Sequence, residues 1–247
     1  MERADRNKQQ AGDTAAYFDG EAAGWSGRYR ESRHFRARLK TVLGWLVKMS
    51  PGLSVLDYGC GSGVLLRELA AGGFQVTGVD VSEGMLDAAR RNLADAGSVR
   101  LERVGPDFGG AYLDAAYNVI TSLGVLEYLD DPWRLLEMLA GVLKPGGSLI
   151  ISVPNRASLL RFVERIVFRN PGPFRAIRLF SHLTGPQSYL NYQRYQFTVA
   201  ELNRFMHGRG LHVDRVRYHV APDGLGALEG WSAVGMIAII SYRKSPG

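Results

Sequence analysis

The chain has very little cysteine, because only Cys60 occurs among its 247 residues. A single cysteine excludes a disulfide scaffold and a cysteine-based zinc site, and it is usual in a reducing compartment. Long apolar runs are missing too: the longest, Ala233 to Ile240, is far shorter than a bilayer-spanning stretch. The polar residues from Met1 to Asp19 lack the apolar core of a secretory signal. We therefore expect a cytoplasmic protein, and peripheral contact with a membrane stays open.

Extremes of composition are absent as well. Apolar residues make up 46% of the chain and charged residues 22%, which excludes intrinsic disorder, collagen-like repetition and a coiled coil as the main architecture. Lysine and arginine (30) outnumber aspartate and glutamate (24), which gives a net charge of +6. A basic balance favours an anionic partner, and nucleic acid, a membrane surface and an acidic substrate all qualify.

The middle of the chain alternates short apolar strands with helices. This alternation predicts a parallel sheet with helices on both faces, whose strands present their carboxyl ends on one edge, where ligands bind. The last part predicts one more helix, with a capping box at Thr198 and Glu201, and two final strands that pair as an antiparallel end. The expected strands are 53–56, 74–79, 99–104, 117–121, 148–153, 211–219 and 232–242, and the expected helices are 64–71, 82–96, 131–143 and 198–208.

Two segments lie outside this alternation. Residues 1–16 read as a frayed polar lead and the following residues as helical, so we expect an N-terminal helical cap over residues 1–49. Residues 50–247 are then expected to form one α/β domain of seven strands. An insertion after the fifth strand, at about 154–196, is expected to be a helical lid.

The glycine-rich turn after the first strand carries the strongest chemical signal. Asp57 ends the strand, and Gly59, Gly61 and Gly63 follow at alternate positions around Cys60. Glycines let the backbone turn sharply and let a ligand lie against it, and the amide groups at a helix N-terminus favour a carboxylate or phosphate. The Asp57 carboxylate can accept hydrogen bonds from an ammonium group. The turn therefore suits an amino-acid-like ligand with one negative and one positive end.

A second acidic residue, Asp80, ends the next strand. A carboxylate at this position can accept hydrogen bonds from both hydroxyls of a ribose. A dinucleotide fingerprint would require glycine or alanine where Val64 stands. The G-x-G-x-G spacing therefore argues against a nicotinamide or flavin cofactor, and a nicotinamide oxidoreductase is an alternative that a lack of NAD binding would exclude.

These segments together resemble the class I S-adenosylmethionine-dependent methyltransferases. The glycine turn resembles the first motif of that family, and Gly78 to Ser82 resembles its acidic second motif. The likeness is greatest to the small-molecule branch that includes ubiquinone-biosynthesis and natural-product O-methyltransferases, and it implies a seven-stranded Rossmann-like sheet. Three further segments match in the right order: Asp107-Phe108, Leu126 to Pro132, and Leu143 to Gly147.

The resemblance implies that the cofactor is S-adenosylmethionine, and it assigns the contacts of the methionine and ribose parts. Gly59, Gly61 and Gly63 would line the methionine part. Asp57 would meet the amino group, directly or through water, and Asp80 would bind the ribose. No metal is expected.

The same resemblance assigns the adenine side and the segment after the fourth strand. Val81 and Phe108 would pack against the adenine, and Asp107 would accept a hydrogen bond from its amino group. Ser122 and Leu123 would lie beside the methionine part. Within the glycine turn, Cys60 is expected to be a small packing residue. In the cap, Trp25 and Tyr29 are expected to cover the cofactor, and Arg38 is expected to pair with the carboxylate of the cofactor.

The catalytic residues are less clearly indicated. Methyl transfer from a sulfonium depends mainly on holding the acceptor in line, and a base helps when the acceptor is a hydroxyl. His219, at the end of a strand expected to run parallel, and His182, in the insertion, are candidate bases, and Glu127 and Tyr128 are expected to line the acceptor site. Tyr128 stands where relatives often carry histidine, and a phenol with a pKa of about 10 does not simply replace it. The other histidines, His34, His207 and His212, are expected at the surface.

The insertion begins with two stripes at helical spacing. Leu159 and Phe162 belong to an apolar stripe, and Arg161, Arg165 and Arg169 recur every four residues on another. We favour a lid helix over the acceptor pocket with a solvated basic face; the alternative is a basic amphipathic helix on an anionic membrane. Both hold if the acceptor is a lipid. Three tyrosines are expected to line that pocket or to pack the lid: Tyr189, Tyr192 and Tyr195.

The positive charge is concentrated in the cap and the insertion. Residues 28–40 and 155–182 each contain six basic residues and one glutamate, so the rest of the chain is net acidic. Because these two segments are expected to cover the active site, an anionic or membrane-borne small molecule is a better hypothesis for the acceptor than nucleic acid.

We therefore predict methyl transfer from S-adenosylmethionine to a hydroxyl of a natural product, quinone or lipid-like metabolite, with N- and C-methylation left open. A nucleic-acid methyltransferase is an alternative, although Ser122 to Val125 does not resemble the Asn-Pro-Pro-Tyr-type tetrapeptide of many base-amino methyltransferases. A cofactor-binding protein without catalytic turnover is another.

Overall fold

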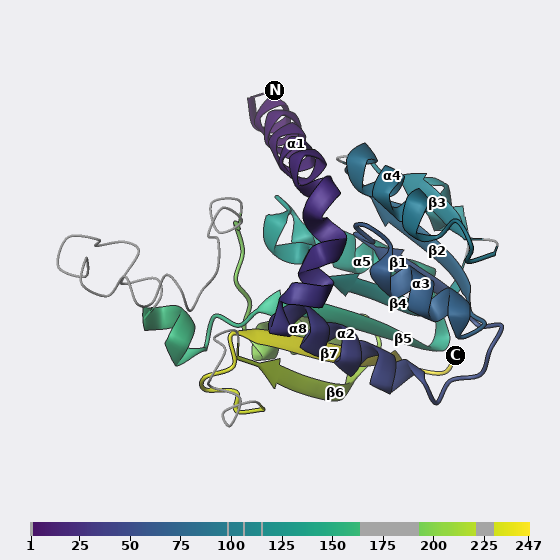
Figure 1. The fold of residues 1–247 in the computed structure, drawn as a ribbon. Coiled ribbons are helices and arrows are strands. Elements are labelled where there is room, and N and C mark those ends of the chain that lie inside the picture. Colours follow the sequence, from purple (N-terminus) through teal and green to yellow (C-terminus); the bar gives the residue numbers. More distant parts are fainter. Residues whose placement is uncertain (1, 98, 106, 115, 164–192, 221–229) are drawn as a thin grey trace.

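A computed structural model arranges the chain around one seven-stranded sheet (Figure 1). It describes residues 2–97, 99–105, 107–114, 116–163, 193–220 and 230–247, with side chains from residue 14 onward. The strands are β1 (Ser54–Tyr58), β2 (Gln75–Asp80), β3 (Arg100–Arg103), β4 (Tyr117–Leu123), β5 (Leu143–Pro154), β6 (Leu211–His219) and β7 (Ile237–Lys244).

The strand order is β3-β2-β1-β4-β5-β7-β6. Strands β1 to β5 pair in parallel, and β7 runs antiparallel to both β5 and β6. Strand β6 therefore points in the same direction as the first five strands, so its carboxyl end lies on the same edge as theirs. The predicted Rossmann-like α/β fold and its antiparallel end are confirmed.

Helices cover both faces of the sheet and each face has its own core. On one face, helices α2, α3 and α4 contribute residues such as Val42, Leu66 and Leu86 to a buried apolar cluster. On the other face, α5 and α8 contribute residues such as Leu136 and Met206. The helices that follow α1 are α2 (Arg33–Leu46), α3 (Val64–Ala71), α4 (Glu83–Asn92), α5 (Pro132–Val142) and α8 (Val199–His207), with short 3₁₀ turns η1 (Ala111–Asp114) and η2 (Leu126–Tyr128).

The N-terminal helix α1 (Glu2–Glu31) is longer than the sequence predicted. The expected frayed lead over residues 1–16 is wrong, since the helix already begins at Glu2. Its first turns are rich in alanine, arginine, glutamine and lysine, which have high helix propensity even without an apolar face. Helix α1 crosses the carboxyl edge of the sheet and packs against α4 (Figure 1).

Some element boundaries differ from the expected ones. Strand β5 begins at Leu143 rather than near residue 148, because Leu143 already pairs with Tyr117 before an irregularity in the register. Strand β7 begins at Ile237 rather than at residue 232, because the preceding residues form a turn in which Gly235 N donates to Trp231 O at 2.8 Å. Neither difference moves the carboxyl edge of the sheet.

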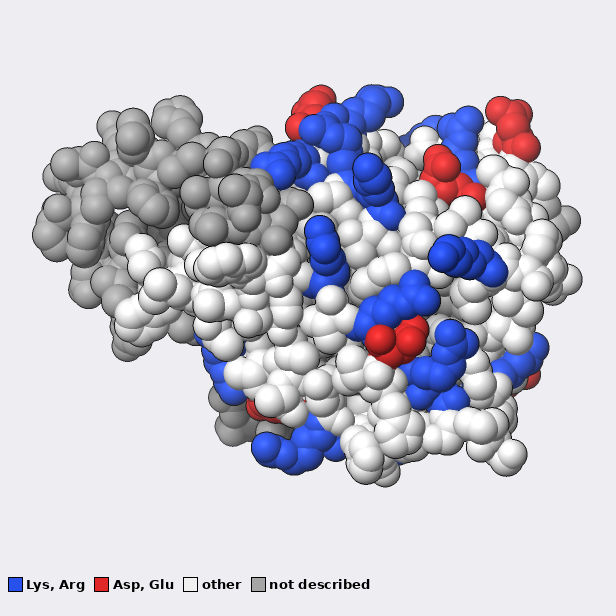
Figure 2. Space-filling view, turned by 90° about the horizontal axis from the view of Figure 1, so that it is seen from below, with Lys and Arg blue, Asp and Glu red and all other residues white. Residues whose placement is uncertain are grey.

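Basic side chains gather on the face where α2 and β6 lie. Figure 2 shows this side of the molecule from below, where lysine and arginine are far more frequent than aspartate and glutamate. The exposed basic residues of these two elements and the turn after α2 are Arg36, Lys40, Lys48, Arg215 and Arg217.

Candidate cofactor and acceptor site

The turn between β1 and α3 has a backbone conformation that favours glycine. Gly59, Gly61 and Gly63 have φ angles of 77°, 52° and 75°. A Cβ atom on Gly61 would lie 3.0 Å from the indole Nε1 of Trp25, so helix α1 packs directly over the turn. Cys60 is buried, and burial raises its thiol pKa well above the usual value, which fits a packing role rather than a nucleophile.

The carboxylate of Asp80 is a structural part of this turn. Its Oδ2 accepts from Gly61 N at 2.8 Å and its Oδ1 from Ser82 N at 3.0 Å. Burial raises the pKa of Asp80, while these backbone donors and that of Val81 oppose the rise. A carboxylate has about four acceptor positions, so Asp80 can still accept from the hydroxyls of a ribose. Sequence reasoning missed that the same side chain holds the turn in place.

The carboxyl group of Asp57 lies at the end of β1 and is 4% exposed. Burial is the main reason why the pKa of Asp57 is raised to about 6. A 2.7 Å hydrogen bond from Thr121 Oγ1 lowers this pKa. The charge of Asp80 raises it further, and the charge of Arg38 lowers it. Asp57 is therefore mostly ionised at neutral pH, as the capture of an ammonium group requires. Sequence analysis did not identify Thr121 as a candidate site residue, because it lies inside an apolar strand.

Arg38 brings a positive charge from α2 to the same edge. The side chain is 7% exposed, and its Nη1 would lie 2.7 Å from a Cβ atom on Gly124, whose φ is 73°. Tyr29 of α1 forms a side-chain hydrogen bond with Arg38. Among the described residues, the buried atoms Arg38 Nε and Ser122 Oγ have no hydrogen-bond partner. A ligand or water normally completes such groups.

Glu127 lies in η2, directly after β4, and is 6% exposed. Burial raises its pKa to about 7, although a backbone hydrogen bond and the charges of Arg38 and Arg161 lower it. Its Oε2 is buried without a partner in the described part of the chain. The neighbouring Tyr128 ring contacts Phe18 of α1 edge-on, with centroids 5.3 Å apart. Both residues therefore lie between the sheet edge and the cap.

The structure corrects the expectation for one histidine. His219 is buried at the end of β6, and its Nε2 lies 3.0 Å from Thr41 Oγ1 of α2. His34, expected at the surface, belongs to the same region, because burial and then the charges of Arg38, Arg161 and His219 lower its pKa to about 3. His207 and His212 are exposed and touch each other, with ring centroids 4.9 Å apart.

Part of the expected acceptor site lies outside the described residues. His182, Tyr189 and Tyr192 fall there, as do Arg165, Arg169 and most of the expected lid. Tyr195 is described: its hydroxyl donates to Asp130 O at 3.0 Å and its backbone N donates to Glu127 O at 3.2 Å. Tyr195 therefore ties the segment before α8 to η2.

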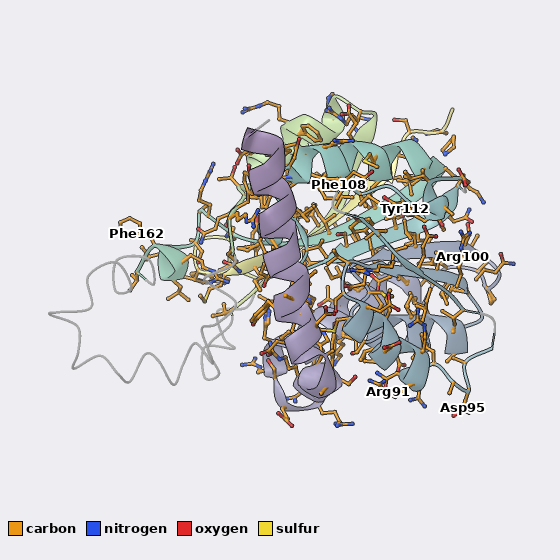
Figure 3. All side chains as sticks on the ribbon, turned by 90° about the horizontal axis from the view of Figure 1, so that it is seen from above. Arg91, Asp95, Arg100, Phe108, Tyr112 and Phe162 are labelled. Atoms are coloured by element: carbon orange, nitrogen blue, oxygen red, sulfur yellow. The ribbon has the colours of Figure 1, made fainter. Side chains whose placement is uncertain are left out.

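Arg161 is the largest departure from the expected pattern. It was expected on a solvated basic stripe, but it is 2% exposed, while Leu159 and Phe162 on the same helical turn are 59% and 51% exposed. Phe162 lies on the outer side of this turn, away from the sheet (Figure 3). The guanidinium Nε donates to Met236 O at 3.4 Å, which holds the side chain against the end of β5 and the start of β7. The solvated-stripe interpretation is therefore wrong for Arg161.

The expected adenine side is more exposed to solvent at Asp107 than the glycine turn is at Asp57 and Asp80. Asp107 is exposed, and its Oδ1 accepts from Gly109 N at 3.3 Å. Phe108 has a φ of 66° and is buried in the core of the α5 face, where Tyr112 Oη donates to its carbonyl oxygen (Figure 3). Val81 accepts from Arg103 Nε through its carbonyl oxygen at 3.2 Å. Leu123, at the end of β4, is half-buried.

Two further properties of the described residues bear on the site. No group of three or more histidine, cysteine, aspartate and glutamate side chains there is arranged to hold a metal ion. None of the helices there combines the length and the apolar character needed to cross a membrane.

Comparison with known proteins gives a consistent picture. Residues 26–216 match the family described as "Methyltransferase domain". The ubiquinone biosynthesis O-methyltransferase of Bordetella pertussis is 34% identical over 143 residues, which are 56% of this chain and 59% of the relative. That of Coxiella burnetii is 40% identical over 106 residues, 42% of this chain and 45% of the relative. This chain thus spans about half the length of the curated relatives that it matches.

A solved structure has the same fold. Magnesium protoporphyrin IX methyltransferase from Synechocystis PCC 6803, crystallised with bound SAH, superposes with a TM-score of 0.62. The match covers 85% of this chain and 83% of that one at 21% identity. At this level of identity the similarity establishes the fold alone.

Proposed function

Because the chain belongs to the methyltransferase-domain family and has the class I S-adenosylmethionine-dependent fold, we propose that it transfers a methyl group from S-adenosylmethionine to a hydroxyl of a small organic acceptor. The observation that carries this proposal is the grouping of Asp57, Arg38 and Glu127 beside the glycine turn. The names of the ubiquinone O-methyltransferase relatives support O-methylation of a quinone, natural product or lipid-like metabolite.

The residues at the sheet edge suit this cofactor. Asp57 would hold the amino group, Arg38 the carboxylate and Asp80 the ribose. The buried, unpartnered Arg38 Nε and Ser122 Oγ within the described chain support this fit, because a ligand would complete them. The remaining proposed contacts are Gly59, Cys60, Gly61, Gly63 and Leu123 at the methionine part, and Val81, Asp107 and Phe108 at the adenine.

The chemistry needs positioning and one proton acceptor. The cofactor supplies a methyl group on a sulfonium, which is a good leaving group, so alignment of the acceptor provides much of the rate. Glu127 is our candidate base, since a carboxyl group with a pKa of about 7 can take a proton from a hydroxyl near neutral pH. Tyr128 and His219 would orient the acceptor, and His182 stays a second candidate base.

Calorimetric titration with S-adenosylhomocysteine tests the cofactor assignment. The wild-type protein is expected to bind it, and Asp57→Asn to bind at least about tenfold more weakly, because a charged hydrogen-bond acceptor is lost. Asp87→Asn, an exposed carboxylate on α4, is the control and should bind like the wild type. Absence of wild-type binding, or equal binding by Asp57→Asn, would contradict the proposal.

Two alternatives predict different results. A nucleic-acid methyltransferase would bind tRNA or DNA with an affinity that falls steeply with salt. A cofactor-binding protein without turnover would bind S-adenosylhomocysteine but leave a broad panel of phenols, quinols and hydroxylated lipids unmethylated by mass spectrometry. Methylation of a hydroxyl in that panel would exclude the second alternative.

An acceptor carried by a membrane is supported by one further observation. Leu159, Phe162 and Trp231 are 59%, 51% and 64% exposed, and we call them the apolar corner. Leu159 N donates to Ala233 O at 2.7 Å, which joins the two segments that carry them. Exposed apolar side chains on a protein of net positive charge favour peripheral contact with an anionic membrane. On this proposal the protein is cytoplasmic and visits the membrane surface.

A further inference from the structure

Helix α1 lies over the glycine turn without belonging to either core of the protein. Among residues 14–31, whose side chains the structure describes, none is part of a buried apolar cluster, and Ala22 is the only buried apolar residue. Trp25 nevertheless lies against Gly61, and α1 crosses the carboxyl edge of the sheet (Figure 1). This helix can therefore move away from the sheet at a smaller cost than the elements that form the cores, since few buried apolar contacts are lost.

The hydrogen bonds between α1 and α4 come from one side of α1. Asp19, Ala22 and Ser26 recur at i, i+3 and i+7, which places them on the same side of the helix. Asp19 Oδ1 accepts from Gly84 N in the first turn of α4, at 2.9 Å. Ser26 Oγ accepts from Asn92 Nδ2 in the last turn of α4, at 2.8 Å. The two helices therefore run side by side, and polar contacts join them at both ends of α4.

Asn92, the last residue of α4, joins three segments of the chain. Its Nδ2 donates to Ser26 Oγ of α1 at 2.8 Å and to Ser62 O of the glycine turn at 2.7 Å. Ser26 Oγ donates to Ser62 Oγ at 2.9 Å, which closes a triangle of hydrogen bonds. A side-chain amide carries two N–H donors, so Asn92 uses one toward α1 and the other toward the turn. We call Asn92, Ser26 and Ser62 the amide junction.

Close packing fixes two of the three members of the amide junction relative to each other. A Cβ atom on Gly63, next to Ser62, would lie 3.1 Å from Ala89 Cβ and 3.1 Å from Leu93 Cδ1. Both Ala89 and Leu93 belong to the buried core between the sheet and α2, α3 and α4. Asn92 and Ser62 are thus held by that core, whereas Ser26 belongs to a helix outside it. Ser26 is therefore the member of the junction that can separate from the other two.

We propose that Asn92 is a positioning residue that holds α1 closed over the glycine turn, and that the cofactor enters and leaves after Ser26 separates from Asn92 and Ser62. This inference rests on the proposed function, because it concerns cofactor exchange at the same site. Trp25 precedes Ser26 directly, so the movement that opens the junction also uncovers Gly61. The opened hydrogen bonds are replaced by bonds to water, which keeps the cost of opening small and lets α1 close again.

The test measures rate constants, because a gate and a deformed turn change them differently. Binding of S-adenosylhomocysteine is followed by stopped-flow tryptophan fluorescence, since Trp25 lies against the turn. In Asn92→Ala, the association and dissociation rate constants are both expected to rise about tenfold, as for two lost hydrogen bonds, so the affinity changes by less than either. Faster dissociation with unchanged association would indicate a deformed turn and would overturn the inference, as would wild-type values of both constants.

A second variant breaks the same junction from the side of α1. Ser26→Ala leaves the glycine turn and α4 unchanged, and it too should raise both rate constants. In the double variant Ser26→Ala/Asn92→Ala, the increase should be smaller than the product of the two separate increases, because both changes remove one shared contact. Increases that simply multiply would show that the two residues act independently, which contradicts the proposal.

The matched control is Asn203→Ala on α8, at the other face of the sheet. Asn203 is half-buried and its Oδ1 accepts from Tyr242 Oη at 2.9 Å, so the variant should lower the melting temperature but keep wild-type rate constants. Hydrogen exchange of α1, measured on the protein alone, should be faster in Asn92→Ala than in the wild type and in Asn203→Ala. Equal exchange would overturn the inference. A failure of the proposed function is recognised separately, because S-adenosylhomocysteine would then not bind, and the exchange measurement still decides on the junction.

Discussion

At the scale of single residues, Thr121 controls the charge state of Asp57. Its hydroxyl donates to Asp57 Oδ1 at 2.7 Å and opposes the effect of burial on the pKa of that carboxyl group. Asp57 has a pKa of about 6 with this hydrogen bond in place, so losing the bond moves the pKa closer to neutrality. The affinity of Asp57 for an ammonium group then becomes sensitive to pH near neutrality.

Thr121→Val is therefore expected to weaken the binding of S-adenosylhomocysteine about fivefold at pH 6, as for one lost hydrogen bond, and less at pH 8. The pH dependence arises because the raised pKa leaves more Asp57 protonated at the lower pH. Calorimetry at both pH values measures this. Thr121→Ser keeps the hydroxyl and should resemble the wild type, and unchanged binding by the valine variant at pH 6 would refute the role of the hydrogen bond.

Glu127 gives a prediction on activity. The base must be ionised, so the methylation rate is expected to rise with pH through about 7, the pKa of this carboxyl group. Glu127→Gln should lower kcat by about 10² to 10⁴ and remove this rise, while S-adenosylhomocysteine still binds. Methylation rates of the wild type and of Glu127→Gln, measured from pH 5.5 to 8.5, test this prediction. A glutamine variant with the wild-type rate would exclude Glu127 as the base.

The same residue gives a prediction on stability, with a defined sign. Burial raises the pKa of Glu127 from 4.5 to about 7, so the folded protein binds a proton that the unfolded chain has already lost. Stability is therefore expected to fall as pH rises from about 4.5 to 7. Asp57, whose pKa burial raises to about 6, adds a similar trend.

Melting temperatures measured between pH 5 and 8 test this second prediction. Glu127→Gln should reduce the decline without abolishing it, because Asp57 still contributes. Glu137→Gln, an exposed carboxylate on α5 paired with Arg209, is the control and should leave the slope unchanged. A decline as steep in Glu127→Gln as in the wild type would show that Glu127 ionises normally.

At the scale of elements, helix α1 acts as a strap over the carboxyl edge of the sheet. Asp19 Oδ1 accepts from Ser82 Oγ at 2.5 Å and from Gly84 N at 2.9 Å, at the N-terminus of α4. Ser26 Oγ donates to Ser62 Oγ at 2.9 Å, and Trp25 lies against Gly61. Helix α1 is thus held to α4 through Asp19 and to the glycine turn through Trp25 and Ser26.

Asp19→Ala should loosen this strap. Losing two hydrogen bonds at a helix N-terminus is expected to destabilise the protein by about 1 to 3 kcal/mol and to weaken the binding of S-adenosylhomocysteine. Limited proteolysis should cut α1 faster in this variant than in Asp87→Ala, which removes only a surface ion pair. Equal cleavage rates would mean that α1 is held mainly by its apolar contacts.

The sequence predicted the placement of those candidate site residues that local rules determine. The glycine turn, Asp57 and Asp80 follow from strand ends and glycine spacing, and these residues lie where the pattern placed them. The burial of Arg161 and of the His34 ring was missed, because packing decides which side of a helix faces inward. The hydrogen bond from Thr121 to Asp57 was missed, because the sequence does not show whether a threonine inside a strand only packs in the core or also donates to a neighbouring side chain.

Among the helices and strands, too, some could be predicted from local sequence patterns and others could not. The strands and helices from β1 to β5 were found because apolar runs alternate regularly with capped helices. The first half of α1 was missed because it has no apolar stripe, although its alanine, glutamine and arginine content favours helix. Composition, rather than periodicity, was the available signal for that segment.

At the scale of the whole molecule, the apolar corner and the net charge of +6 give a prediction on membrane contact. The protein is expected to sediment with vesicles containing phosphatidylglycerol and not with vesicles of phosphatidylcholine alone, because charge attraction brings it to the surface. The double variant Phe162→Ser/Trp231→Ser should lose most of this binding. Val47→Ser, which removes an apolar residue after α2 that is 76% exposed, should not, and unchanged sedimentation of the double variant would exclude the corner as a contact.

The position of α1 in the chain has an evolutionary consequence. Asp19, Trp25 and Tyr29 all precede the first strand, so one wall of the site is encoded by a continuous stretch that the sheet does not interrupt. Recombination upstream of α2 can replace that wall in a single event and leave every strand, and the core beneath them, unchanged. Exchange of this segment would thus change the cover over the glycine turn, whereas Asp57 and Asp80 on the strands would be inherited as one block.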